Sequence, residues 1–182
     1  MSKRAIIVVD LQNEYLATGK LPLVGIDAAT ANAVRVIADA RAKGVPVLHV
    51  RHESTSSDAP IFVPGSDGVR IMAAVAPVGD EPVIVKNHVN SFRDTDLRQQ
   101  LEARGIEDVV VVGAMSHMCV DAVVRASADM GYAVTVLHDA CATRDLEFNG
   151  VVAPAAQVHA AMMASFEFGY GRVLATDAYL AD

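Results

Sequence analysis

Cysteine is scarce in this sequence: its 182 residues include only Cys119 and Cys141. Two cysteines in a chain of this size do not make a disulfide framework, so we expect a reducing, cytoplasmic setting. Tryptophan is absent and aromatic residues make up 5% of the chain, although 52% of its residues are hydrophobic. Much of that content is alanine and valine, which is the composition of a compact α/β fold.

Positive charge is also limited. Lysine and arginine total 15 against 22 aspartates and glutamates, so the net charge is −7. This balance argues against nucleic acid or an anionic membrane as a partner. No apolar run approaches the roughly 18 to 20 residues of a membrane-spanning helix, and the first ten residues lack the pattern of a signal peptide. Because neither a GxGxxG motif nor a P-loop occurs, nucleotide binding has little support. We expect no cofactor.

What the chain does contain is a series of short runs rich in valine and isoleucine, which are typical of buried parallel strands. Helix-like segments alternate with these runs from end to end, and no repeat or linker divides residues 1–182. The pattern predicts a single domain with a Rossmann-like, three-layer α-β-α sandwich around a six-stranded, mostly parallel sheet. Expected strands lie at 5–9, 45–50, 83–86, 109–112, 134–137 and 172–175; expected helices lie at 25–43, 69–75, 95–104, 117–130 and from Pro154 onward, with a long loop at 51–68.

Reactive residues follow three of these strands. Asp10 follows the first run, Lys86 ends the third, and Cys119 comes shortly after the fourth. In open parallel sheets ligands bind just beyond the carboxyl ends of the strands. An acid, a base and a thiol are therefore expected to meet in one crevice, although they lie far apart in the sequence.

Cys119 falls near the first turn of a predicted helix, where free backbone N–H groups and the helix dipole favour a thiolate and lower its pKa. Such a thiolate is a nucleophile, and the same N–H groups can hold an oxyanion. The alternative is that Cys119 is a small buried hydrophobic residue of its helix. Cys141 is a rival nucleophile, but it lacks a helix N-terminus, so we interpret it as a packing residue.

Asp10 and Lys86 each have an ordinary alternative as well. A carboxylate after a strand often bonds loop amides, and a lysine at a strand end usually reaches solvent. Beside a thiol, however, the carboxylate can exchange protons with it and the ammonium can stabilise both anions. The joint occurrence of all three residues favours the functional interpretation.

Three segments together resemble one family. Asp10 lies in VVDLQNEYL, Lys86 in VKNHVNSF and Cys119 in VVVGAMSHMCVDAVVRASADMGY. These motifs look like the Asp–Lys–Cys triad of the isochorismatase-like cysteine hydrolases, a superfamily that includes nicotinamidase and N-carbamoylsarcosine amidohydrolase. The resemblance covers nearly the whole chain.

The resemblance implies a role for each residue. Cys119 corresponds to the nucleophile, Asp10 to the general acid/base, and Lys86 to the charge that holds the thiolate. It also implies a cis peptide bond between Ala114 and Met115, with the N–H groups of Met115 and Cys119 as the oxyanion hole. The implied substrate is a small-molecule amide, ureide or carbamoyl compound, and the implied assembly is a homo-oligomer, a dimer or a tetramer.

Two differences between this sequence and other members of the superfamily narrow the expected activity. Family members that open a vinyl ether carry glycine at the nucleophile position, so Cys119 favours cleavage of a carbon–nitrogen bond. Nicotinamidases have a metal site of Asp and His residues soon after the second strand, and the segment His49–Thr55 lacks that pattern. We therefore expect no metal. Vinyl ether hydrolysis with Asp10 as the acid, and a non-catalytic binding protein, remain the alternatives.

Three more residues are candidates for substrate binding. Gln12 closely follows Asp10 and can bond an amide, His52 opens the long loop, and the resemblance puts Phe92 over the substrate. His117 is expected to be structural. Arg51, Arg93 and Arg144 are all candidates for pairing with a substrate carboxylate, and the sequence does not choose among them.

Overall fold

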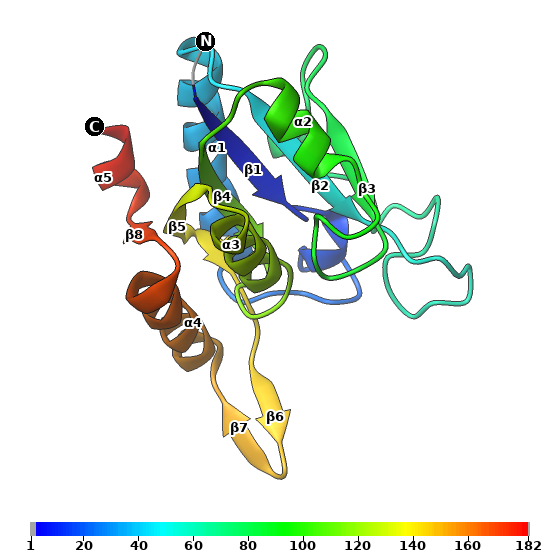
Figure 1. The fold of residues 1–182 in the computed structure, drawn as a ribbon. Helices are drawn as coiled ribbons and strands as arrows, with labels where there is room; N and C mark the ends of the chain where they lie inside the picture. Colours follow the sequence, from blue (N-terminus) through cyan, green and yellow to red (C-terminus); the bar gives the residue numbers. More distant parts are fainter. Residues whose placement is uncertain (1–2, 182) are drawn as a thin grey trace.

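The computed structural model describes residues 3–181 and is built around a six-stranded sheet (Figure 1). In spatial order the strands are β3 (Val83–Lys86), β2 (Val47–His52), β1 (Arg4–Val9), β4 (Asp108–Ala114), β5 (Ala133–Ala142) and β8 (Arg172–Leu174). Every neighbouring pair in this sheet is parallel. The prediction of a six-stranded parallel sheet is confirmed.

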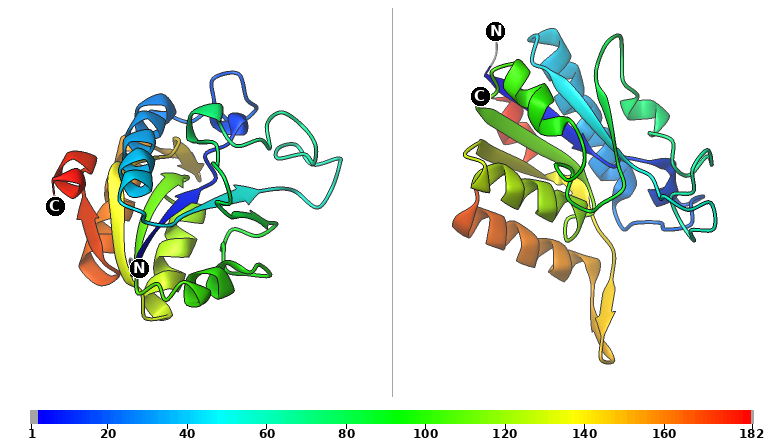
Figure 2. Two further views of the ribbon diagram at one scale, coloured as in Figure 1. Left: turned by 90° about the horizontal axis from the view of Figure 1, so that it is seen from above. Right: turned by 45° about the vertical axis from the view of Figure 1, so that its right-hand side comes forward.

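Helices cover both faces of the sheet, as the two turned views show (Figure 2). One face packs against α1 (Ile26–Ala42) and the short α5 (Thr176–Leu180), and the other against α2 (Leu97–Ala103), α3 (Cys119–Asp129) and α4 (Ala155–Gly169). Strand β1 shows why both layers are needed. Its Ile6 and Val8 enter one hydrophobic cluster, while Ile7 and Val9 enter the other. A strand that is apolar on both faces is buried only between two layers of helices, so the predicted α-β-α sandwich is confirmed.

Several element boundaries differ from those predicted from the sequence. The helix expected at 117–130 begins at Cys119, because residues 115–118 form the turn that leaves β4. Pro154 caps α4 instead of opening it, since its backbone is extended and its carbonyl accepts the first helical hydrogen bonds. Strand β5 continues to Ala142, beyond the predicted 137, because it pairs with the end of β4 past a bulge. Cys141 therefore lies in a strand.

Other short elements are new or smaller than expected. The segment 69–75 forms only the 3₁₀ turn η2 (Ala73–Val75), and η1 (Asn13–Tyr15) follows β1. A hairpin of β6 (Leu146–Phe148) and β7 (Val151–Ala153), which the sequence did not suggest, projects away from the sheet (Figure 1). The helix expected at 95–104 spans 97–103, and the last strand ends at Leu174, where Ala175 caps α5. Across residues 3–181 no helix has the length and apolar character needed to cross a membrane.

The predicted long loop is present and begins later than expected, because β2 extends through His52. Between His52 and η2 the chain forms no regular helix or strand. This loop leaves the carboxyl end of β2 (Figures 1 and 2). Asp10 directly follows β1 and Lys86 ends β3, so both lie at the same edge of the parallel sheet.

Candidate active site

Three elements bring Asp10, Lys86 and Cys119 to this edge of the sheet. Asp10 directly follows β1, Lys86 is the last residue of β3, and Cys119 is the first residue of α3 after β4. The side chains of Asp10 and Lys86 are fully buried, and Cys119 is 6% exposed. Asp10 has a positive φ of 50°, an uncommon conformation for a residue other than glycine and one that clusters at functional sites.

The ammonium group of Lys86 is the centre of the cluster. Its Nζ lies 2.8 Å from Oδ2 of Asp10, 3.1 Å from Sγ of Cys119 and 3.0 Å from Nδ1 of His52. A lysine ammonium has three N–H donors and no acceptor. Nδ1 of His52 must therefore accept, so the His52 ring is neutral and carries its proton on Nε2.

The environment shifts the pKa values of Lys86, His52 and Cys119. Burial lowers the pKa of Lys86, but the carboxylate of Asp10 and the hydrogen bond to Sγ of Cys119 outweigh burial and leave this pKa above its ordinary value. Burial, and then the charge of Lys86, lowers the pKa of His52. Burial and the carboxylate of Asp10 raise the pKa of the Cys119 thiol well above its ordinary value, although Lys86 opposes them. The expectation that the helix N-terminus lowers this pKa was wrong, because desolvation and Asp10 dominate at this site.

The backbone between β4 and α3 is unusual in two places. Gly113 has a φ of 131°, and a Cβ atom there would collide with the backbone carbonyl of Val9. Glycine therefore lets β4 approach the end of β1 closely. One residue further on, the peptide bond between Ala114 and Met115 is cis, which is the bond named from the resemblance.

This turn also leaves backbone donors free beside the thiol. The N–H groups of Ser116 and Val120 donate to the carbonyls of Ala142 and Met115. Among the turn and loop hydrogen bonds of residues 3–181, none uses the N–H of Met115 or of Cys119. Both are the groups expected to form an oxyanion hole.

A cavity of about 280 Å³ opens beside Cys119. Its walls come from η1 and the segment after it, the long loop, the segment after β3, and the turn before α3. The lining residues are Tyr15, Leu21, His52, Ser54, Ala59, Pro60, Ile61, Phe62, Val89, Met115, Met118 and Cys119. A concave, mostly apolar pocket with a buried thiol in its wall is the usual form of a small-molecule site.

Comparison with known proteins places this arrangement in a family. The model of the isochorismatase domain matches residues 4–178. This chain belongs to the isochorismatase family. An uncharacterized isochorismatase family protein of Bacillus subtilis, YddQ, is 42% identical over 97% of this chain and 98% of its own length. The family is hydrolytic, so the chain is an isochorismatase-family hydrolase.

Solved structures of other members share the fold. A putative isochorismatase hydrolase from Oleispira antarctica superimposes with a TM-score of 0.95, at 49% identity over 98% of this chain and 96% of that one. N-carbamoylsarcosine amidase from Thermoplasma acidophilum superimposes with a TM-score of 0.82, at 26% identity over 97% of this chain and 98% of that one. Amide-cleaving enzymes are thus among the relatives of this isochorismatase-family hydrolase.

Two of the three residues suggested for substrate binding, Gln12 and Phe92, do not line the cavity beside Cys119. Both amide N–H donors of Gln12 are used by the protein itself, on the backbone carbonyls of His52 and Val69, each at 2.8 Å. Its Oε1 accepts from the N–H of His52 at 2.9 Å. Gln12 therefore holds the base of the long loop and has no donor left for a substrate. Phe92 packs against the hydrophobic cluster of α2 and α3 and does not line the cavity.

His52 does line the cavity, and Phe62 is the aromatic residue found where Phe92 was expected. The rings of Phe62 and His52 are edge to face, with their centroids 5.1 Å apart. The rings of Tyr15 and Phe62 are arranged in the same way, with their centroids 5.4 Å apart. Sequence reasoning missed Tyr15 and Phe62. Phe62 could have been suggested because it lies in the long loop, and long loops in compact domains are often functional. No comparable feature of the sequence pointed to Tyr15, which lies in η1.

The same cluster has the spacing of a metal site. Asp10, His52 and Cys119 each place one ligand-type atom within 4.8 Å of the other two. The ammonium of Lys86, however, already contacts all three residues at hydrogen-bond distance. A metal ion here would have to displace a buried lysine cation, so the donor set fits Lys86 better than a metal.

The remaining candidates lie outside the cavity lining. Nδ1 of His117 lies 2.6 Å from Oγ1 of Thr143, which fits its expected structural role. Cys141 is buried, and its pKa is raised to about 12 by desolvation. None of Arg51, Arg93 and Arg144 lines the pocket beside Cys119.

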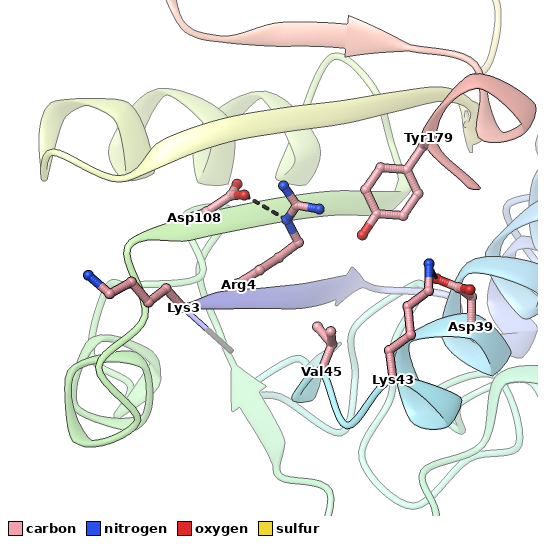
Figure 3. A pocket seen from close by; sticks show the side chains of 7 residues that line it. All are labelled: Lys3, Arg4, Asp39, Lys43, Val45, Asp108 and Tyr179. Carbon is pink, nitrogen blue, oxygen red and sulfur yellow. Dashed lines mark hydrogen bonds and ion pairs between the residues drawn. The ribbon is translucent and has the colours of Figure 1, made fainter. Parts of the chain in front are cut away.

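A larger cavity, of about 450 Å³, lies at the opposite edge of the sheet (Figure 3). Four of its charged side chains form two pairs: Nε of Arg4 lies 2.6 Å from Asp108, and Nζ of Lys43 lies 3.0 Å from Asp39. Because it lies at the amino ends of β1 and β4, it is not where a parallel sheet binds its ligand.

Proposed function

We propose that this protein hydrolyses a carbon–nitrogen bond of a small amide, ureide or carbamoyl compound through a thioester on Cys119. One observation carries the proposal. The Cys119 thiol forms part of the wall of an apolar cavity, and behind it lie a fully buried carboxylate and ammonium, Asp10 and Lys86, 2.8 Å apart. A nucleophile, a proton acceptor and a fixed cation are the parts that acyl transfer needs.

In the first step Asp10 takes the proton from Sγ of Cys119, and the thiolate attacks the substrate carbonyl. A carbon–sulfur bond forms, and the oxyanion is held by the N–H groups of Met115 and Cys119. As the carbonyl re-forms, the carbon–nitrogen bond breaks. Asp10 returns its proton to the departing nitrogen, which leaves as ammonia or an amine.

In the second step water hydrolyses the thioester. Asp10 removes a proton from the water, which attacks the carbonyl carbon, and the carbon–sulfur bond breaks. The departing thiolate takes the proton from Asp10, and the acid product leaves. Throughout, Lys86 keeps its charge, because its pKa is raised, and stabilises each anion as it forms.

The raised pKa of Cys119 agrees with this sequence of steps. At rest the thiol keeps its proton and Asp10 keeps its ion pair with Lys86. The thiolate is then formed only when a carbonyl is in place to receive it. The relationship to N-carbamoylsarcosine amidase supports the choice of a carbon–nitrogen bond, and a cysteine at position 119 argues against vinyl ether chemistry.

The test is intact mass spectrometry of the protein mixed with a panel of small amides, ureides and carbamoyl compounds, with ammonia release measured in parallel. We expect a Cys119-bound acyl adduct from a turned-over compound, and none in Cys119→Ala, which should keep its circular dichroism and lose more than about 1,000-fold in kcat. Cys141→Ala is the matched control and should remain active.

Two results would decide against the thiol mechanism. Full activity in Cys119→Ala would remove the nucleophile from the reaction. A Cys119→Gly variant that still hydrolyses an isochorismate-like vinyl ether would favour the alternative chemistry, with Asp10 as the acid.

A further inference from the structure

The walls of the cavity beside Cys119 bear no net charge. Of the residues that line it, none is Asp, Glu, Lys or Arg, and its one histidine, His52, is neutral. Most of the wall is aliphatic or aromatic, with Leu21, Ile61, Phe62 and Met118 from three separate segments of the chain. A ligand in this cavity is therefore surrounded by apolar surface.

Two cations near the cavity, Lys86 and Arg51, are already paired, and the buried carboxylate of Glu14 accepts from the N–H of Phe62 at 3.3 Å. Asp10 and Lys86 neutralise each other at 2.8 Å, and Nη2 of Arg51 lies 2.7 Å from Oε2 of Glu53. A substrate carboxylate that entered the cavity would lose its hydration without meeting a free cation. The cost of burying an unpaired charge is several kcal/mol, whereas an amide or an apolar group meets no such penalty.

One wall residue supplies a polar contact. Tyr15 is 1% exposed and lines the cavity, and no hydrogen bond of its hydroxyl is found within residues 3–181. Burial, and then the carboxylate of Asp10, raises the pKa of Tyr15, so the hydroxyl stays neutral and can donate. A buried hydroxyl usually has a partner, and a ligand in the cavity that Tyr15 lines can supply one.

We propose that the substrate is a small, uncharged amide whose scissile bond is flanked by an apolar group, and that Tyr15 donates a hydrogen bond to a polar atom of this substrate. The assignment rests on the proposed thiol hydrolase. It excludes compounds that carry a carboxylate or an ammonium beside the amide.

The test compares benzamide with two derivatives that carry a charged para substituent, 4-carbamoylbenzoate and 4-carbamoylbenzylammonium, and uses 4-ethylbenzamide, which should behave like benzamide, as the neutral control for the size of that substituent. Turnover is measured for each, together with its protection of Cys119 from iodoacetamide in the Cys141→Ala background. We expect benzamide to exceed both charged compounds at least 100-fold, in kcat/KM or in the concentration needed for protection. Equal or better recognition of the carboxylate would overturn the substrate class while leaving the thiol mechanism in place.

Two variants sharpen the comparison. Ile61→Lys places a cation in the cavity wall and should improve recognition of 4-carbamoylbenzoate at least tenfold relative to benzamide. Val78→Lys adds the same charge at a residue that is 60% exposed, outside the cavity lining, and should leave the ratio unchanged. An unchanged ratio in Ile61→Lys would show that the substrate does not occupy this cavity.

Tyr15→Phe tests the hydrogen bond separately. We expect KM, or the protecting concentration of benzamide, to rise about tenfold, because one neutral hydrogen bond is lost while the ring stays against Phe62. An unaltered value would remove Tyr15 from the proposal. If neither turnover nor protection is seen with any compound of the wider panel, the proposed function itself fails, and the substrate class with it.

Discussion

Nζ of Lys86 lies 3.0 Å from Nδ1 of His52, so the imidazole is an acceptor for an ammonium that also forms an ion pair with Asp10 and donates to Cys119. His52 thereby fixes the direction of the lysine, and its neutral form is the one that can do so. The edge-to-face contact with Phe62 holds the ring in turn.

The first prediction concerns this hydrogen bond. His52→Leu should lower kcat about tenfold, because Lys86 loses an acceptor, while His52→Gln keeps an acceptor and should lose less. Wild-type kcat should fall as the pH drops through the pKa of His52, which burial and Lys86 hold below 6.5, since a protonated Nδ1 cannot accept. His52→Gln should lack this contribution to the pH profile of kcat. Equal losses in both variants, with unchanged profiles, would show that His52 only packs.

The second prediction concerns the reactivity of the thiol. Alkylation of Cys119 should be slow near pH 7 and accelerate with pH, because its pKa is raised. Asp10→Asn removes a charge that raises this pKa, so alkylation at pH 8 should be faster, by roughly three- to fourfold for each unit of pKa lost, because the thiolate fraction rises while its intrinsic nucleophilicity falls. The same variant should abolish turnover, because it removes the proton acceptor. Iodoacetamide rates read by intact mass in the Cys141→Ala background measure this, and a slower rate in Asp10→Asn would contradict it.

The third prediction concerns stability in acid. Glu81 accepts from Nε and Nη2 of Arg41, both at 2.8 Å, from the N–H of Val78 at 2.9 Å and pairs with His49 at 3.0 Å. Burial raises the pKa of Glu81, but these hydrogen bonds outweigh it and hold the pKa at about 2, below its ordinary 4.5. The resulting stability is present above pH 4.5 and is lost as the pH falls toward 2.

Glu81→Gln should therefore lower the free energy of unfolding by roughly 2 to 3 kcal/mol at pH 7 and flatten its decline between pH 4.5 and 2. Glu107 is the matched control, because its pair with Lys3 at 2.9 Å is largely exposed. Glu107→Gln should cost less than about 1 kcal/mol. Urea titrations of the three proteins at several pH values would show the difference, and similar effects from both variants would count against the buried network.

The fourth prediction concerns Gly113. An alanine there would collide with the carbonyl of Val9 and would have a φ of 131°, so Gly113→Ala should cost more than about 2 kcal/mol and lower kcat. Gly169→Ala at the end of α4, where nothing lies close to an added Cβ and no positive φ is required, should be within about 0.5 kcal/mol of wild type. Thermal unfolding and kcat of the two variants provide the measurement.

Much of the fold could be predicted from the sequence. The apolar runs at 5–9 and 109–112 are hydrophobic on every residue, which indicates strands that are covered on both faces, and both lie in the central pair of the sheet. Boundaries were less accurate where long-range pairing decides them. Strand β5 extends beyond 137 because its last residues pair with the end of β4, and local propensity carries no information about that partner.

The same division holds for the site. Asp10, Lys86 and Cys119 could be selected from the sequence because each follows or ends an apolar run, and the carboxyl ends of parallel strands meet at one edge of the sheet. Gln12 and Phe92 could not be judged in this way, since whether an amide bonds the backbone or a ligand depends on which loop folds over it.

The sequence by itself determined the layers, the parallel sheet and the edge that carries the thiol, because these follow from the periodicity of buried residues along the chain. Only the tertiary structure decided that His52 accepts from Lys86, that Tyr15 and Phe62 line the cavity, and that the thiol keeps its proton. Distances and desolvation are set by residues far apart in sequence, and they exist only once the chain has folded.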